Sequence, residues 1–346
     1  MDILRSLRRF SFHLAIYLFI VALIAAGSVL LKVYGPPRYI YSDDSWKDST
    51  PYVPQTDVKY DLLLDQHSHT KYSDGKLTVR QNIEWHLALG FKVVVISDHN
   101  TLKNLEEIQL LANEYANRCI VIQGMEWTTN RVHLNFIGIK NWTLEIPWNP
   151  TNDEIRQAID EVHRQNGTVT FNHPGYTRRT SEENVPSNEL LYSWGVDYFE
   201  VMNGLDFDEG SYNFVKSHNN TVGMISGTDM HSPAKQDGGR VFAWTAINIT
   251  NFSKEAVMNT LRNYSTEIVI NQFGIENQGK YEYNKLYDYL APFYQIGDAI
   301  VYYHLSSDQY GGYADRVILY VFLSYSALFF VVLEAILAFR RSLRNK

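Results

Sequence analysis

The stretch Tyr60-Asp-Leu-Leu-Leu-Asp-Gln-His67-Ser-His69 runs from a short apolar segment into two histidines that are two residues apart. Side chains of an extended chain alternate between two faces, so histidines at this spacing point in the same direction. Neutral imidazole is a common ligand of metal ions in proteins. The stretch therefore predicts a β-strand that ends in a metal-binding pair of histidines.

After this pair, short runs rich in Val and Ile alternate with segments of helical periodicity. This alternation is typical of βα units around a parallel sheet, so the sequence predicts an α/β fold. Strands are predicted at residues 60–64, 92–97, 120–124, 134–139, 168–172, 198–202 and 222–226. Helices are predicted at residues 79–89, 102–116, 152–165, 188–194 and 253–263, with Asn152 and Ser253 as N-caps.

Histidines and carboxylates stand at the ends of these predicted strands. In barrels of parallel strands, catalytic side chains gather at the C-terminal strand ends, so these residues are expected to meet at one mouth. A single His-x-His pair indicates little, whereas the whole set at strand ends indicates a multinuclear metal site. The candidate ligands are His67, His69, Asp74, His99, Glu126, His133, His173, Asp229 and His231.

The motifs that contain these residues occur in one order over about residues 60–250. They are Asp65-Gln-His67-Ser-His69-Thr70, Ser73-Asp-Gly75, Ile96-Ser-Asp98-His99-Asn-Thr101, Gly124-Met-Glu126, Asn172-His-Pro-Gly175 and Gly227-Thr-Asp229-Met-His231. This set resembles the polymerase-and-histidinol-phosphatase (PHP) superfamily. Within it, Gly124-Met-Glu-Trp-Thr-Thr129 followed by Val132-His133 resembles the branch of carbaryl-hydrolase-like metallohydrolases.

The resemblance implies a distorted, TIM-like (βα)7 barrel that holds two or three divalent metal ions. The implied ligand groups are His67, His69, Glu126 and Asp229 for the first ion, Glu126, His133 and His173 for the second, and Asp74, His99 and His231 for the third. Some members of the family have His where Asp74 stands. Nitrogen and oxygen ligands without thiolate suit Zn²⁺, Mn²⁺ or Fe²⁺, and the sequence leaves that choice open.

Two ions bridged by Glu126 are expected to hold a shared water as hydroxide, which attacks phosphorus in line. A nearby cation is then expected to meet the charge on the phosphate oxygens, and arginine matches these oxygens with two hydrogen bonds. The candidates are Arg178, Arg179 and Arg240, each of which is equally compatible with an exposed surface position. Asp98 is expected to orient a metal ligand through a hydrogen bond.

Other residues of the same types are interpreted without a role in metal binding. Cys119 lies in an apolar run and is predicted to be buried. Substrate contact and a turn position are both compatible with Asn100, Thr101 and Asn203. Five further histidines are predicted to be structural: His13, His86, His163, His218 and His304.

Two long apolar runs, at residues 12–31 and 317–339, flank the motif-bearing region. At about 1.5 Å per residue, each is long enough to cross a hydrocarbon core of roughly 30 Å, so each is predicted to be a transmembrane helix. A cleavable signal peptide is the alternative for the first run, and its length favours an uncleaved anchor. Basic residues lie outside both runs: Arg5, Arg8, Arg9, Arg340, Arg341, Arg344 and Lys346. The positive-inside rule then places both termini in the cytoplasm and the catalytic part on the lumenal or extracytoplasmic side.

These features predict an order of segments along the chain. It comprises basic tails at 1–11 and 340–346, transmembrane helices at 12–31 and 317–339, a juxtamembrane linker at 32–59, a PHP-like domain at 60–265 and a Tyr-rich extension at 266–316. The extension is interpreted either as a contact with lipid head groups or as a packed addition to the barrel. Six Asn-x-Ser/Thr sequons permit glycosylation, beginning at Asn141, Asn166, Asn219, Asn248, Asn251 and Asn263.

The leading functional hypothesis is a membrane-anchored metal-dependent phosphoesterase acting on a small or lipid-linked phosphate, such as a lipid or glycolipid head group. The alternatives are a hydrolase of carboxylic or carbamic esters, and a non-catalytic membrane scaffold that keeps the fold. The expected partners are the lipid bilayer and a phosphorylated substrate, and no protein partner can be inferred. The net charge is −7, and without the seven basic residues of the two ends, Asp2 and Glu334 there remain 24 basic and 36 acidic residues, a net charge of −12. This negative charge excludes a nucleic-acid surface on the central region.

Overall fold

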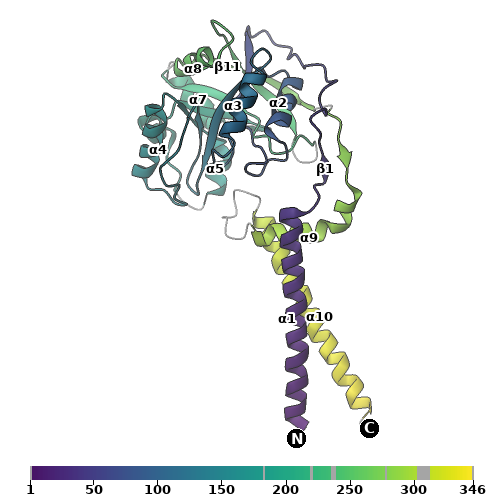
Figure 1. Ribbon diagram of the computed structural model, residues 1–346. Helices are drawn as coiled ribbons and strands as arrows, with labels where there is room; N and C mark the ends of the chain where they lie inside the picture. Colours follow the sequence, from purple (N-terminus) through teal and green to yellow (C-terminus); the bar gives the residue numbers. More distant parts are fainter. Residues whose placement is uncertain are drawn as a thin grey trace. The chain divides into compact units, whose positions relative to one another are not determined.

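The computed structural model describes residues 2–181, 184–218, 221–234, 239–276, 279–301 and 312–344. The chain divides into two compact units, whose elements are labelled in Figure 1. One unit, here called the helical unit, comprises Met1–Ile40 and Tyr283–Lys346, and the other, the sheet unit, comprises Tyr41–Glu282. Three residues named above lie outside the described part of the chain: Asn219, His304 and Lys346.

The helical unit contains α1 (Asp2–Tyr34), α9 (Lys285–Val301) and α10 (Gly312–Arg344). Leu4–Tyr34 of α1 and Val317–Leu343 of α10 are long and apolar enough to cross a membrane, by length and composition. Their apolar side chains are mostly exposed, which suits a helix surrounded by lipid. A signal sequence at the N-terminus would have the same composition as α1.

Helices α1 and α10 are antiparallel where they touch. The ring of Tyr17 stacks on Phe330 with centroids 4.8 Å apart, and its hydroxyl lies 3.0 Å from the hydroxyl of Ser326. The imidazole of His13 pairs with the carboxylate of Glu334. Lower numbers in α1 thus meet higher numbers in α10, so the first residues of α1 and the last residues of α10 lie at the same end of this helix pair.

Helix α9 carries part of the tyrosine-rich segment. The ring of Tyr287 stacks on that of Tyr294, with centroids 4.5 Å apart, and the Tyr294 hydroxyl donates to the Pro36 carbonyl at 2.7 Å. Asp298 forms an ion pair with Lys32 at the end of α1. Residues 285–301 are therefore a helix packed inside the helical unit, whereas residues 266–276 form a strand of the sheet unit.

The sheet unit is a mixed α/β fold with a strongly curled sheet. All seven predicted strands are present: β2 (Leu62–Asp65), β3 (Val93–Ile96), β4 (Ile120–Thr128), β5 (His133–Ile137), β6 (Thr168–Phe171), β7 (Tyr198–Asn203) and β9 (Gly223–Gly227). The prediction of a wholly parallel sheet is wrong at β5, which runs antiparallel to both β4 and β6. Only residues 129–132 join β4 to β5, and a parallel crossover needs about a dozen residues or more.

Three further strands of the described sheet were not predicted. β10 (Arg240–Ile247) pairs with β2 and with β11 (Thr266–Glu276), both antiparallel, and β8 (Asp206–Phe207) pairs with β7. Strand β11 therefore belongs to the sheet, and the sheet unit extends beyond the predicted domain of residues 60–265. The two-residue strands β1 (Tyr39–Ile40) and β12 (Glu282–Tyr283) lie outside this sheet.

The curled sheet is drawn together beyond β9. Ser68 and Met230 form an isolated bridge, and the amide of Asp229 donates to the carbonyl of His67 at 2.8 Å. Within the strands themselves, the hydroxyl of Ser226 on β9 lies 3.0 Å from the hydroxyl of Thr245 on β10. These contacts fix the segments after β2 and β9 side by side.

The strands are surrounded by helices in Figure 1. The predicted ones are α2 (Val79–Ala88), α3 (Leu105–Glu114), α4 (Asn152–Arg164), α6 (Asn188–Ser193) and α8 (Lys254–Arg262); α5 (Pro174–Thr180) and α7 (Glu209–Ser217) were not predicted. Ser253 caps α8 as expected, by accepting from the amide of Ala256. The cap of α4 is Thr151 instead of Asn152, because the Thr151 hydroxyl accepts from the Glu154 amide in a capping box.

Residues 41–59, predicted to be an extended linker, instead pack on the sheet unit, and we call them the strap. Trp46 is buried and stacks on Tyr41. The ring of Tyr52 stacks on Trp244 of β10 at 5.4 Å, and its amide donates to the Ala88 carbonyl at 3.0 Å. The close approach depends on Gly90, whose φ is +88° and where a Cβ would collide with the Tyr52 carbonyl.

Replacement of Trp244 by alanine should lower the free energy of unfolding by about 3–5 kcal/mol. The Trp244 side chain is fully buried, stacks on Tyr52 of the strap and donates through Nε1 to the Leu89 carbonyl at 2.9 Å. Urea unfolding of the purified full chain, followed by near-ultraviolet circular dichroism, measures the loss. Trp148→Ala is the control, since Trp148 is 36% exposed and should lose far less. Equal losses in the two variants would contradict the packing described here.

Candidate metal centre

The nine candidate ligands meet at one end of the curled sheet. They follow β2 (His67, His69), precede α2 (Asp74), follow β3 (His99), lie within β4 (Glu126), open β5 (His133), follow β6 (His173) and follow β9 (Asp229, His231). Because β5 is antiparallel to its neighbours, its first residue lies at the same sheet end as their last residues. The side chains form three groups that could each hold a metal ion, although the ions' number and identity are open.

The first group consists of His67, His69, Glu126 and Asp229. Asp229 Oδ1 lies 3.2 Å from His67 Nε2 and 3.0 Å from His69 Nε2, and Glu126 Oε2 lies 3.4 Å from each of these nitrogens. Ligands bound to a tetrahedral ion at about 2.0–2.1 Å stand roughly 3.3–3.4 Å apart. All four atoms are buried and have no hydrogen-bond partner among the described residues. Their spacing and their lack of partners fit a shared cation.

The second group adjoins the first through Glu126, which presents Oε2 to the first group and Oε1 to the second. Oε1 lies 3.0 Å from His133 Nδ1 and 3.3 Å from His173 Nε2. The amide of Asn172 donates to the same oxygen at 3.1 Å. Glu126 is fully buried, so both of its oxygens depend on these neighbours.

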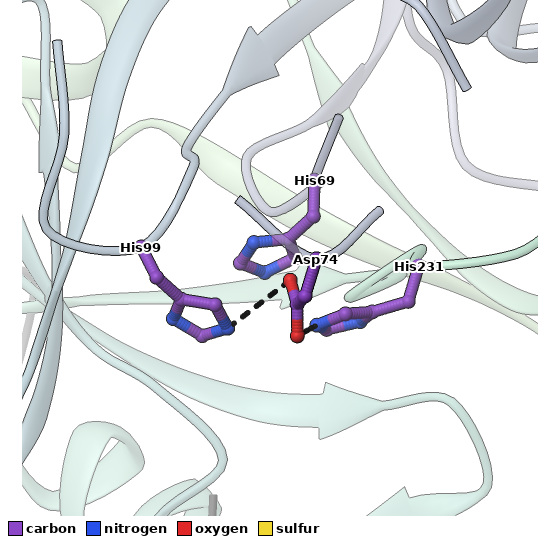
Figure 2. Close-up of side chains that lie close together, drawn as sticks. All are labelled: His69, Asp74, His99 and His231. Atoms are coloured by element: carbon purple, nitrogen blue, oxygen red, sulfur yellow. Dashed lines mark ion pairs between the residues drawn. The ribbon is translucent and has the colours of Figure 1, made fainter. Parts of the chain in front are cut away.

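The third group consists of His69, Asp74, His99 and His231, with Asp74 between two of the imidazoles in Figure 2. Asp74 Oδ2 lies 3.2 Å from His231 Nε2, and Oδ1 lies 3.7 Å from His99 Nε2. The ring of His69 stacks on those of His231 and His99, with centroids 4.1 and 4.3 Å away. The resemblance had implied only the other three residues, so His69 belongs to two groups.

The charges of the centre stabilise one another. Burial favours the neutral forms of Glu126 and Asp229, but the surrounding imidazoles outweigh burial and hold both pKa values well below their usual range. Burial likewise disfavours protonated His67, yet the carboxylates of Asp229, Glu200 and Glu126 raise its pKa well above the usual value. The site is thus built for positive charge at its centre, which protons or metal ions supply.

The buried His69 and the partly exposed His231 differ in their pKa values. Burial and the neighbouring imidazoles of His231 and His99 lower the pKa of His69 to about 4. In His231 the carboxylates of Asp229 and Asp74 outweigh burial and raise the pKa to about 9. His69 is therefore neutral and ready to ligate near pH 7, whereas His231 must first lose a proton.

Asp98 holds the loop between the first histidine pair and Asp74. Its carboxylate accepts from the amide and hydroxyl of Thr70 at 2.7 and 2.6 Å, from the Ser73 hydroxyl at 2.7 Å and from the Asn104 amide group at 2.6 Å. Asp98 thus holds Thr70, which follows His69, and Ser73, which precedes Asp74. None of these four hydrogen bonds involves His99.

The three arginines predicted to bind phosphate are engaged by other partners. Arg240 pairs with Glu276 across β10 and β11, and Arg179 pairs with Asp206 of β8 at 2.6 Å. The guanidinium of Arg178 lies over the ring of Phe171 and donates to Asn188. Carboxylates of β8 and β11, two strands that the sequence did not predict, account for two of these pairings.

Several residues outside the nine contribute to the site or to its surroundings. Glu200 of β7 is buried and accepts from His67, and the sequence signal for it was an acidic residue inside an otherwise apolar strand. The predicted structural role fits His86, which is buried and bonded to Asp65 at 2.7 Å, and His163, which pairs with Asp197. Cys119 is buried as predicted, and burial raises its pKa to about 12.

The family model of the PHP domain matches residues 65–278, which is more than half of the chain. The chain belongs to the PHP domain family. The matched part contains β3 through β11 and all nine candidate ligands.

A solved structure shares this fold. A two-domain protein from Bacteroides vulgatus, described as containing a predicted PHP-like metal-dependent phosphoesterase, is 20% identical, with a TM-score of 0.52 over 71% of this chain and 74% of that one. A protein from Bifidobacterium adolescentis assigned as a metal-dependent phosphoesterase (18% identical, 49% and 87% covered) and an amidohydrolase from Chromobacterium violaceum (16%, 60% and 97%) both have TM-scores of 0.39. No curated protein matches the chain in sequence.

Divalent metal binding by the third group should strengthen as pH rises. A metal ion needs the neutral ring of His231, whose pKa is about 9, so below that pH it competes with a proton. Affinity at this group should fall about tenfold per pH unit below the pKa. Calorimetric titration of the metal-free chain with Mn²⁺ at pH 7.0, 7.5 and 8.0 measures the slope, and His231→Gln is the control that should flatten it. If the affinity of the third group for Mn²⁺ does not change with pH, this assignment is wrong.

Proposed function

We propose that this protein is a membrane-anchored, metal-dependent phosphoesterase. The observation that carries the proposal is the first ligand group, in which four buried ligand atoms stand 3.0–3.4 Å apart and have no hydrogen-bond partner within the described part of the chain. Membership of the PHP domain family supports it, and so does the fold shared with the Bacteroides vulgatus protein described as PHP-like. We further infer that the seven strands of the curled sheet form the distorted barrel of this family.

In this proposal the nine side chains hold two or three divalent ions, with Zn²⁺, Mn²⁺ and Fe²⁺ as the candidates. Bound ions supply Lewis acidity and activate water as the nucleophile. Glu126 fixes the spacing of the first two groups, because each of its oxygens faces one of them. Asp98 fixes the loop that carries His69 and Asp74 through its bonds to Thr70 and Ser73.

The buried walls of the centre define where a substrate enters. The side chains of His67, His69 and Glu126 are fully buried, whereas those of Asp229 and His231 are 23% and 34% exposed. A phosphate group therefore approaches over Asp229 and His231, and the interior donors and acceptors are already in place. Because the three predicted arginines have other partners, the negative charge of the phosphate would be balanced by bound ions and by the imidazoles around them.

The proposal places α1 and α10 across a membrane, with the sheet unit on the lumenal or extracytoplasmic side. The antiparallel contacts of Tyr17 with Ser326 and Phe330 support a hairpin with both chain ends on one side. Basic residues at those ends favour the cytoplasm for them. The predicted order of tails, spans and catalytic domain is retained, with the domain widened to residues 41–282. A substrate presented at a membrane, such as a lipid or glycolipid head group, suits this arrangement.

The full chain should hydrolyse p-nitrophenyl phosphate or bis-p-nitrophenyl phosphate, and a chelator should abolish the activity until Zn²⁺, Mn²⁺ or Fe²⁺ is restored. His67→Ala should lose bound metal and at least about 100-fold in kcat/KM, because one of four ligands of the first group is gone. His218→Ala, whose ring contacts Phe214 away from the ligands, is the matched control. Activity on a naphthyl carbamate alone would instead favour the ester hydrolase suggested by Glu126-Trp-Thr-Thr129. A folded chain with neither metal nor activity would indicate a scaffold.

Cysteines introduced at Ser6 and Ser342 should react with a membrane-impermeant maleimide from the same side of sealed vesicles. This follows because α1 and α10 are antiparallel and both substitution sites lie near their terminal ends. The native Cys119 is buried and serves as an internal control that stays unlabelled in the folded protein. Labelling of the two sites from opposite sides would rule out the hairpin.

A further inference from the structure

Glu200 is a buried carboxylate of β7 that lies outside the nine candidate ligands. Its Oε1 accepts from the side-chain amide of Gln66 at 2.7 Å and from His67 Nδ1 at 3.0 Å. Its Oε2 accepts from the backbone amide of His173 at 2.7 Å and from the side-chain amide of Asn203 at 2.9 Å. Four donors therefore converge on two oxygens, and a carboxylate is the side chain that accepts at both.

The contact with His67 fixes which ring nitrogen is free to bind a cation. A carboxylate accepts a hydrogen, so the shared proton lies on His67 Nδ1 and the lone pair lies on Nε2. Nε2 is the atom that faces Asp229 Oδ1 at 3.2 Å and Glu126 Oε2 at 3.4 Å in the first group. The bond also fixes the rotation of the ring, as second partners of metal-bound histidines do.

The contact with His173 acts through the backbone. His173 has a φ of +28°, which is unfavourable for a residue with a Cβ and has to be held by its surroundings. Its amide donates to Glu200 Oε2, while its Nε2 lies 3.3 Å from Glu126 Oε1 in the second group. The Glu200 carboxylate thus holds one ligand of the first group by its ring and one ligand of the second group by its main chain.

We propose that Glu200 is a positioning residue that sets the two ligand groups relative to each other, opposite the bridging carboxylate of Glu126. The inference rests on the proposed function only in that the groups hold divalent ions, and it does not depend on the substrate. Asn203 strengthens the arrangement, because it donates to Glu200 and its amide lies 3.4 Å from Asp229 Oδ2.

Glutamine cannot replace Glu200 in this network. Its amide group would place an NH₂ where one of the two oxygens now accepts, facing two donors that have no acceptor left. If that NH₂ faced His67, the ring would have to accept at Nδ1 and carry its hydrogen on Nε2. A protonated Nε2 has no lone pair with which to bind a cation. With the NH₂ beside His173 instead, the amide that holds the +28° backbone would lose its partner.

The test is titration of the full chain, purified in detergent and stripped of metal, with Zn²⁺ followed by calorimetry. Glu200→Gln should bind Zn²⁺ about 10–100-fold more weakly than the wild type at the first two groups. Glu200→Asp, which keeps both acceptors but is shorter, should fall between the two. The matched control is Asp197→Asn, because Asp197 also accepts from a histidine (His163, 2.9 Å) and a backbone amide (Val169, 2.7 Å) but contacts none of the nine ligands in these bonds.

A double-mutant cycle separates positioning from a general effect on the fold. In a His67→Ala background, Glu200→Gln should lower the Zn²⁺ affinity of the first group much less than it does in the wild type. The reason is that the hydrogen bond from the His67 ring to Glu200 is already absent from that background. Fully additive losses, or wild-type Zn²⁺ affinity in a folded Glu200→Gln protein, would overturn the proposal. If Glu200→Gln does not fold, Glu200→Asp carries the test, and wild-type affinity in that variant overturns it equally. A wild-type protein that binds Zn²⁺ without hydrolysing phosphate esters would remove the proposed function and leave this inference intact.

Discussion

The burial of the Glu126 carboxylate constrains everything around it. An ionised carboxylate taken out of water is costly unless cations or hydrogen-bond donors surround it. Here the surroundings are five imidazoles from four different segments, contributed by His67, His69, His99, His133 and His173. The sheet has to bring these segments to one point, and it does so because they stand at the same ends of neighbouring strands. A fold that moved any one of these segments away would remove part of the positive charge that stabilises the buried carboxylate.

The fold meets this demand with two layers of support. Behind the ligands, hydrogen bonds from Asp98 and Glu200 hold the loops and rings that carry them. Below that layer, apolar side chains of the strands and helices form the core, with residues such as Trp127 and Phe136 fully buried. The bridge between Ser68 and Met230 joins the segments after β2 and β9, so the polar end of the sheet is closed by backbone hydrogen bonds.

The sequence predicted the strands and the clustering of the nine side chains, because both follow from local patterns: alternating apolar runs, and polar residues where those runs end. It did not predict the direction of β5, which is set by the short connection at residues 129–132. Strands β10 and β11 were missed because a hairpin joined to β2 depends on pairing between distant segments. The partners of Arg179 and Arg240 lie on such unpredicted strands, and Glu200 was overlooked because its four donors come from three separate segments.

The double membership of His69 has a consequence for the order in which ions leave the protein. A neutral imidazole that ligates through one nitrogen carries its proton on the other, so this ring serves a single ion at a time. When the first group claims it, the third group is left with Asp74, His99 and His231, and the His231 side chain is 34% exposed. Fewer ligands and easier access for water imply faster exchange. If all three groups of the proposed centre hold ions, slow dialysis is expected to empty the third group before the two groups that share Glu126.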